Sequence, residues 1–215
     1  ARALVLNTQG LLLDEPLSAL DITTRGRVRR ELKKTLSSLH IPKILVTHDY
    51  EDAISLGDRI LVMDCGRVIQ EGTAKELLMN PRSPFVADFS GTNFFPGTVL
   101  TVGNGKTSVQ AGEKGVMLQS SQSAEGHLSV MIYPWDIRLA KMRPGNGTVN
   151  TVEGTVMNIL PYGNRVRVEM EGALPLTAEI AAEALEHLEL REQGKVYAII
   201  DPGSVQLLTN SRNVI

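Results

Sequence analysis

The chain has 215 residues, of which 42% are hydrophobic and 21% are charged, a balance that is ordinary for a globular protein of one large or two modest domains. The formal net charge of −2 gives no reason to expect a nucleic-acid partner, and the single cysteine, Cys65, excludes an internal disulfide. No apolar run approaches the roughly 18–20 residues of a membrane helix, so we expect any membrane role to be peripheral and to act through a partner.

The first predicted element is a strand that ends in two acids. Leu11–Leu13 is a continuous apolar run, which is typical of a parallel strand buried on both faces. Asp14 and Glu15 follow at once, and Pro16 ends the strand because it has no N–H to donate. Since ligands bind at the carboxyl ends of strands in an open α/β sheet, the two acids predict magnesium-assisted phosphate chemistry. The alternative is a strand-end pair that only caps a helix.

A helix and a second strand are predicted next. Thr23–His40 carries one apolar stripe, with Asp21 as its N-cap; the stripe consists of Val28, Leu32, Leu36 and Leu39. The basic residues of this helix are expected to form a solvated face, with nucleic-acid or lipid-headgroup binding as the alternative: Arg25, Arg27, Arg29, Arg30, Lys33 and Lys34. Lys43–Thr47 predicts a short buried strand with His48 at its end. We therefore expect His48 to converge with the two acids on one phosphate, although a lone histidine is more often structural.

Three segments in this order resemble motifs of ATP-binding-cassette (ABC) ATPases. Leu11–Pro16 resembles the Walker B strand, Ser18–Asp21 resembles the D-loop, and Val46–Asp49 resembles the switch-histidine segment, with Tyr50 where the family usually has glutamine. The resemblance implies that ATP and Mg2+ are the cofactors. It also implies an α/β fold of the P-loop ATPase type, with a parallel sheet and helices, of which this chain carries a part.

The same resemblance implies a role for each site residue. Glu15 is expected to be the general base that polarises the lytic water, Asp14 to hold Mg2+ through its water shell, and His48 to contact the γ-phosphate. The D-loop residues are expected to touch the opposing subunit of a homodimer, because these ATPases close two nucleotides between two protomers: Ser18, Ala19, Leu20 and Asp21.

The phosphate loop of the family, Gly-x4-Gly-Lys-Ser/Thr, does not occur in the sequence. Gly105–Thr107 is a decoy, because Leu100 stands where the first glycine is required. The chain begins with Ala1–Leu4, which resembles the end of the helix after the signature loop. We therefore expect a truncated sequence that has no ATPase activity alone, since it lacks the backbone N–H groups that cradle the phosphates.

The remainder of a first domain, residues 1–90, is predicted from short patterns. The predicted elements are a helix at Asp52–Leu56, strands at Arg59–Asp64 and Arg67–Glu71 around a Cys65-Gly66 turn, a helix at Thr73–Met79 with a Thr73/Glu76 capping box, and a helical turn at Phe85–Phe89. Beyond Gly91 the composition changes to short alternating segments with frequent glycine.

A second domain, residues 91–215, is predicted to be a small antiparallel barrel. Its strands are expected at Gly97–Val102, Thr107–Val109, Gly115–Leu118, Leu128–Ile132, Val152–Ile159, Arg165–Met170, Leu176–Ile180, Val196–Ile200 and Val205–Leu208, with one helix at Ala181–Leu190. Phe94–Val99 and Tyr133–Leu139 resemble the first and closing strands of a TOBE domain, an all-β OB-fold-like module, and Val152–Leu208 resembles a molybdate-binding (Mop-like) half. The Arg-Asn pair that usually precedes the first Mop strand is replaced by Pro144-Gly145-Asn146-Gly147.

Together these resemblances predict the ATP-hydrolysing subunit of an ABC importer at the cytoplasmic face of the membrane. Its expected partners are a second ATPase subunit, transmembrane permease subunits and, indirectly, a solute-binding protein. The first choice of solute is an oxyanion such as molybdate, although sulfate, iron, polyamine and sugar importers also carry TOBE-type tails. The alternatives are an oxyanion-sensing Mop-like module and a soluble ABC ATPase of DNA repair or translation.

Overall fold

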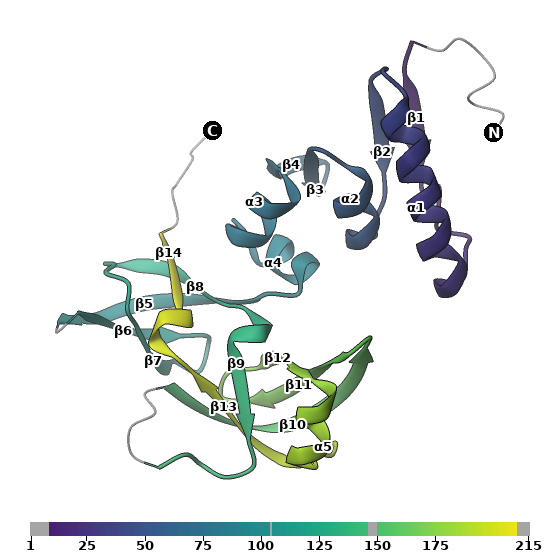
Figure 1. Cartoon of the computed structure of the whole chain (residues 1–215). Coiled ribbons are helices and arrows are strands. Elements are labelled where there is room, and N and C mark those ends of the chain that lie inside the picture. Colours follow the sequence, from purple (N-terminus) through teal and green to yellow (C-terminus); the bar gives the residue numbers. More distant parts are fainter. Residues whose placement is uncertain (1–8, 104, 146–149, 210–215) are drawn as a thin grey trace. The chain divides into compact units, whose positions relative to one another are not determined.

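A computed structural model describes residues 9–103, 105–145 and 150–209 of the chain, which divides into two compact units, residues 1–81 and 82–215 (Figure 1). The segment that resembles the end of the signature helix, 1–4, lies outside the described residues, as do Asn104, Asn146 and Gly147. The predicted division into domains 1–90 and 91–215 stays a prediction. None of the helices in the described ranges combines the length and the hydropathy that a membrane crossing needs.

The described part of the first unit, from residue 9 on, forms two small sheets and three helices. Its elements are β1 (Leu11–Asp14), α1 (Ile22–Ser38), β2 (Lys43–Val46), α2 (Tyr50–Leu56), β3 (Ile60–Asp64), β4 (Arg67–Gly72) and α3 (Ala74–Met79). β1 and β2 pair in parallel, while β3 and β4 form an antiparallel hairpin around the Cys65-Gly66 turn, where both residues have positive φ. Thr73 and Glu76 form the predicted capping box of α3.

The predicted burial of the first two strands is wrong. Leu12 in β1 is 67% exposed, and Ile44 and Val46 in β2 are 64% and 49% exposed. These side chains share one face of a two-stranded sheet, because Leu12 is the partner of Ile44 and side chains alternate along a strand. α1 protects the opposite face, where Leu11 and Leu36 are buried. One helix covers one face, so the described residues do not form the doubly covered parallel sheet that the apolar run predicts.

The second unit is an antiparallel, barrel-like β structure, as predicted. After α4 (Pro84–Ser90), its elements are β5 (Asn93–Gly103), β6 (Lys106–Ala111), β7 (Val116–Ser120), β8 (His127–Ile132), η2 (Pro134–Asp136), β9 (Ile137–Ala140), β10 (Asn150–Tyr162), β11 (Arg165–Gly172), β12 (Leu176–Ala181), α5 (Ala182–Leu188), β13 (Lys195–Ile200), η3 (Pro202–Ser204) and β14 (Gln206–Thr209). Each predicted strand overlaps one of these strands. The strands form two five-stranded sheets, ordered β14-β8-β5-β6-β7 and β12-β11-β10-β13-β9.

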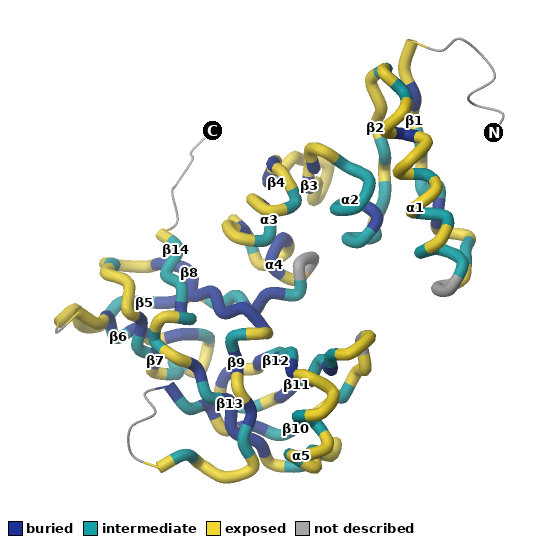
Figure 2. The backbone as a smooth tube through the Cα atoms, in the orientation of Figure 1, coloured by how far each residue is buried: buried dark blue, intermediate teal, exposed yellow. Residues whose placement is uncertain are grey.

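The two sheets repeat one arrangement and exchange their last strands. In each sheet a long central strand, β5 or β10, lies between a strand that follows it and one that returns beside it. β9 follows the first sheet in the chain but pairs with β13 of the second, and β14 pairs with β8 of the first. One apolar core contains residues from both sheets, among them Val109, Val130, Val156, Val168 and Ala198. Figure 2 shows buried stretches along the strands of the second unit.

Two buried asparagines, one from each sheet, form hydrogen bonds with an edge strand of the other sheet. Asn93 opens β5, and its amide donates to the carbonyl of Thr177 in β12 at 2.8 Å and accepts from the Thr177 N–H at 2.7 Å. Asn150 opens β10 and makes the same pair of bonds with Gln119 in β7, at 2.8 and 2.7 Å. Each amide therefore satisfies backbone groups that an edge strand otherwise leaves unpaired.

Candidate nucleotide site

The parallel pairing of β1 and β2 brings the ends of both strands to the same edge. Asp14 is the partner of Val46, and the Glu15 N–H donates to the Val46 carbonyl at 2.9 Å. Glu15 itself has φ 45°, in the left-handed region that non-glycine residues rarely occupy. The chain therefore turns sharply after β1, and the Glu15 side chain reaches His48, the second residue after β2.

Glu15 and His48 lie in direct contact at this edge. Glu15 Oε1 accepts from the His48 backbone N–H at 2.9 Å and lies 2.7 Å from His48 Nδ1. The His48 side chain is 80% exposed and that of Glu15 is 32% exposed. The carboxylate is thus held in place by the end of the neighbouring strand while both side chains remain accessible. A histidine that serves only as packing would be buried, so the geometry favours a site over a core residue.

Asp14, the predicted magnesium residue, is exposed at the last position of β1. Its carboxylate suits Mg2+, because this ion keeps several waters and uses one or two carboxylates. The described residues contain no group of three or more His, Cys, Asp or Glu side chains that could hold a metal by itself. The assignment of Asp14 to Mg2+ therefore stays a prediction that rests on its carboxylate and its exposed place at the end of β1.

The D-loop-like segment is anchored to the same turn. Leu17 is buried, and Ser18 donates from its hydroxyl to the Glu15 carbonyl at 2.9 Å. Asp21 accepts from the Thr24 N–H at 3.0 Å and thereby caps α1, as predicted. Ser18 and Ala19 are exposed, and Leu20 is half-buried. The segment thus presents its first two residues outward while its ends are fixed by Leu17 and Asp21.

Two arginines that the sequence analysis assigned to a solvated face instead pair with acids. Arg25 reaches Asp49 at 3.1 Å, and Arg29 reaches Glu51 at 2.7 Å and Asp52 at 2.5 Å. Burial lowers the pKa of Arg29, but the hydrogen bonds that Arg29 donates to Glu51 and Asp52, and the charges of these acids, outweigh it and raise the pKa above the ordinary value. The signal was present in the sequence: two arginines four residues apart lie on one helix face, and three acids follow the second strand.

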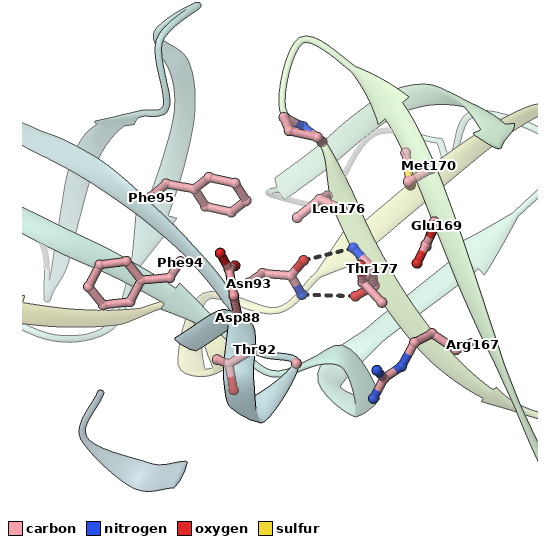
Figure 3. A pocket seen from close by; sticks show the side chains of 12 residues that line it. Asp88, Thr92, Asn93, Phe94, Phe95, Arg167, Glu169, Met170, Leu176 and Thr177 are labelled. Carbon is pink, nitrogen blue, oxygen red and sulfur yellow. Dashed lines mark hydrogen bonds between the residues drawn. The ribbon is translucent and has the colours of Figure 1, made fainter. Parts of the chain in front are cut away.

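A separate cavity of about 400 Å³ lies within the second unit, between the start of β5 and the strands β11 and β12 (Figure 3). Thr92, Asn93, Arg167, Glu169 and Thr177 contribute polar groups to its lining. The nearest carboxylate to the Arg167 guanidinium is that of Glu179, at 3.9 Å, and Glu179 is held more closely by Arg165 at 2.5 Å. Arg167 is therefore a half-exposed cation whose charge is only loosely paired.

Comparisons with known proteins agree with the predicted resemblances. A family model described as the TOBE domain matches residues 148–207, the half that sequence analysis likened to a Mop module. The chain is 35% identical to the molybdate/tungstate import ATP-binding protein WtpC of Pyrococcus abyssi, over 96% of this chain and 59% of that protein. It is 38% identical to the spermidine/putrescine import ATP-binding protein PotA of Borreliella afzelii, over 80% of this chain and 47% of that protein.

The chain thus spans about half the length of the relatives it matches. Among solved structures, the cytoplasmic molybdate-binding protein ModG is similar at 20% identity and a TM-score of 0.47, over 54% of this chain and 95% of ModG.

Proposed function

Because the chain belongs to the family of ABC importer ATP-binding subunits that carry a TOBE domain, we propose that it supplies the catalytic carboxylates and the control barrel of such a subunit. The complete subunit, in which a phosphate loop accompanies this chain, hydrolyses ATP to drive the uptake of a small solute. The observation that carries the proposal is the contact between Glu15 and His48, which joins the ends of two parallel strands.

Each residue has one task in this proposal. ATP would supply the phosphoanhydride bond that is cleaved, and a bound Mg2+ would neutralise the negative charge of the phosphates. Asp14 would hold Mg2+, Glu15 would orient and deprotonate the attacking water, and His48 would donate to the γ-phosphate. Ser18 and Ala19 face the second protomer, since they are the exposed part of the D-loop-like segment.

The test of the ATPase proposal is phosphate release by the complete subunit and two histidine variants. His48→Ala should lower kcat by about 100-fold, the order of effect seen when one donor to a developing charge is lost. His40→Ala is the matched control, because His40 is exposed after the end of α1. Equal turnover by both variants would exclude His48 from the chemistry. The 215-residue chain alone is predicted to release no phosphate.

The proposed solute is an oxyanion of the molybdate type. One relative is named for molybdate and tungstate, but another of similar identity is named for spermidine and putrescine, which are cations. Uptake by vesicles that contain the complete subunit with its permease and binding protein separates these classes. ATP-dependent accumulation of molybdate supports the proposal, whereas accumulation of spermidine instead would assign the system to polyamines.

The proposed assembly places two ATPase subunits on the cytoplasmic face of the membrane, against permease subunits, with the solute-binding protein acting indirectly. The TOBE match favours this importer reading over a soluble ABC ATPase of DNA repair or translation, which leaves the barrel without a role. Cross-linking of the complete subunit to its permease in membranes is the direct test. Failure to co-purify would favour the soluble class.

A second candidate function is oxyanion binding by the barrel, and the loosely paired Arg167 beside the cavity favours it. Calorimetric titration of the 215-residue chain with molybdate tests this function. Saturable binding that Arg167→Gln abolishes would support it. Arg138→Gln is the control, because Arg138 is a surface residue paired with Asp201. A flat titration would leave the barrel without a sensing role.

A further inference from the structure

Arg25 touches both of the loops that the proposed ATPase site uses. Its Nη1 donates to Asp49 Oδ2 at 3.1 Å, and its Nη2 lies 3.3 Å from the carbonyl oxygen of Leu20. Leu20 belongs to the D-loop-like segment, and Asp49 directly follows His48. One guanidinium on α1 therefore joins a residue after β1 to a residue after β2.

The loop around His48 is held from two sides. On one side Glu15 accepts from the His48 backbone N–H at 2.9 Å. On the other side Arg25 pairs with the Asp49 carboxylate, which also caps α2 by accepting from the Asp52 N–H at 2.9 Å. Because each contact fixes a neighbouring residue of the same loop, removal of either leaves the position of His48 less restricted.

Arginine is suited to this position in a way that lysine is not. The guanidinium directs several N–H groups from one rigid plane, so it can donate to a carboxylate and to a backbone carbonyl together. The Arg25 side chain is 27% exposed, and its Nε is buried without a hydrogen-bond partner among the described residues. That unmatched donor indicates that the side chain is oriented by its two terminal contacts.

The neighbouring Arg29 has a different task. It contacts Glu51 and Asp52, both in α2, besides a longer contact of 3.7 Å to Asp49. Those contacts hold α1 against α2 and reach neither Leu20 nor the D-loop-like segment. Arg29 thus maintains the packing of the unit, whereas Arg25 connects the two loops.

We infer that Arg25 is a positioning residue that couples the D-loop-like segment, Ser18–Asp21, to the His48–Asp49 loop. The inference rests on the proposed function, because it concerns the alignment of His48 relative to the second protomer. Arg25 acts through its contacts with these two loops and not on the reacting atoms. Its loss should therefore lower kcat of the complete subunit about tenfold and leave the KM for ATP unchanged.

Hydrogen exchange on the 215-residue chain tests the coupling without any activity. Arg25→Gln should speed amide exchange in both segments, residues 18–21 and 47–50. Arg30→Gln is the control, because it removes the same positive charge from an exposed position of the same helix. Wild-type exchange rates in either segment of the Arg25 variant would overturn the inference, whether or not the complete subunit hydrolyses ATP.

Arg25→Lys separates positioning from folding. Lysine can keep the ion pair with Asp49 but cannot also donate to the Leu20 carbonyl in the same geometry. Its melting temperature should match that of the wild type while kcat falls about tenfold, and full turnover by Arg25→Lys would show that the Leu20 contact is dispensable. Absence of ATPase activity in the wild-type complete subunit would reject the proposed function, and the exchange measurement would still decide the coupling.

Discussion

The two units of the chain are stabilised in different ways. Residues 82–215 enclose an apolar core between two five-stranded sheets, whereas residues 9–81 leave apolar side chains of both small sheets exposed, including Leu12, Ile44, Leu61 and Met63. In the first unit the turns that carry the candidate site are fixed by hydrogen bonds and ion pairs. Burial of an apolar core therefore holds the barrel together, whereas the geometry of the site depends on polar contacts between neighbouring loops.

The largest expected difference is in the free energy of unfolding after the same substitution in each unit, at a buried isoleucine of the second unit and at an exposed isoleucine of the first. Ile132→Ala removes a side chain that is 0% exposed in β8, and we expect a loss of about 2–5 kcal/mol in the free energy of unfolding. Ile44→Ala removes a side chain that is 64% exposed in β2, and we expect a change of about 0.5 kcal/mol or less.

Chemical denaturation measures both variants, because the single tryptophan, Trp135, reports on the second unit and far-ultraviolet circular dichroism reports on the whole chain. If Ile44→Ala shifts the denaturation midpoint measured by circular dichroism as far as Ile132→Ala does, the proposed difference in stabilisation between the two units is wrong.

A smaller effect is expected at the amides that join the two sheets. Asn150→Ala leaves the N–H and carbonyl of the half-buried Gln119 without these partners, and we expect a cost of about 1–2 kcal/mol, because polar groups are then left unsatisfied. Asn158→Ala is the control, because Asn158 is exposed and bonds only the Glu169 carboxylate among the contacts described. Similar denaturation midpoints for the two variants would show that the amide bridge contributes nothing to the joining of the sheets.

The smallest effect concerns a pH-dependent cap in the first unit. Hydrogen bonds from the N–H and hydroxyl of Thr73 hold the pKa of Glu76 below its ordinary 4.5. The carboxylate therefore stabilises α3 above about pH 4.5, and this contribution is lost as the pH falls through the lowered pKa.

Glu76→Gln should remove that part of the acid dependence and leave the melting temperature at low pH unchanged. Thermal melts of both proteins between neutral and acid pH provide the measurement. Parallel melting curves across the whole range would contradict the assigned role of the carboxylate.

The sequence predicted local structure well where one short pattern decides it. The Thr73 cap, the Cys65-Gly66 turn and the strands of the barrel follow from hydrogen-bonding side chains, positive φ and alternation. Burial of Leu12 and Ile44 was predicted wrongly, because an apolar run shows what a strand can pack against and not whether a second layer is present. The exchange of β9 and β14 depends on contacts between distant segments, which alternation does not encode.

The candidate site shows the same division. Asp14, Glu15 and His48 were identified from strand ends, and the structure brings Glu15 and His48 into contact. Arg25 was missed because Asp49, 24 residues away, meets it only when α1 returns the chain to β2, and because no pattern in the sequence marks the local contact with the Leu20 carbonyl. Roles in hydrolysis stay predictions for all of these residues.

The central claim is that the carboxylate after β1 activates the water that cleaves ATP. Single-turnover hydrolysis by the complete subunit with Glu15→Gln tests it most directly, with Glu31→Gln on the exposed face of α1 as the control. We predict that Glu15→Gln binds nucleotide as the wild type does and loses at least about 100-fold in turnover, while Glu31→Gln is unchanged. Wild-type hydrolysis by Glu15→Gln would contradict the account.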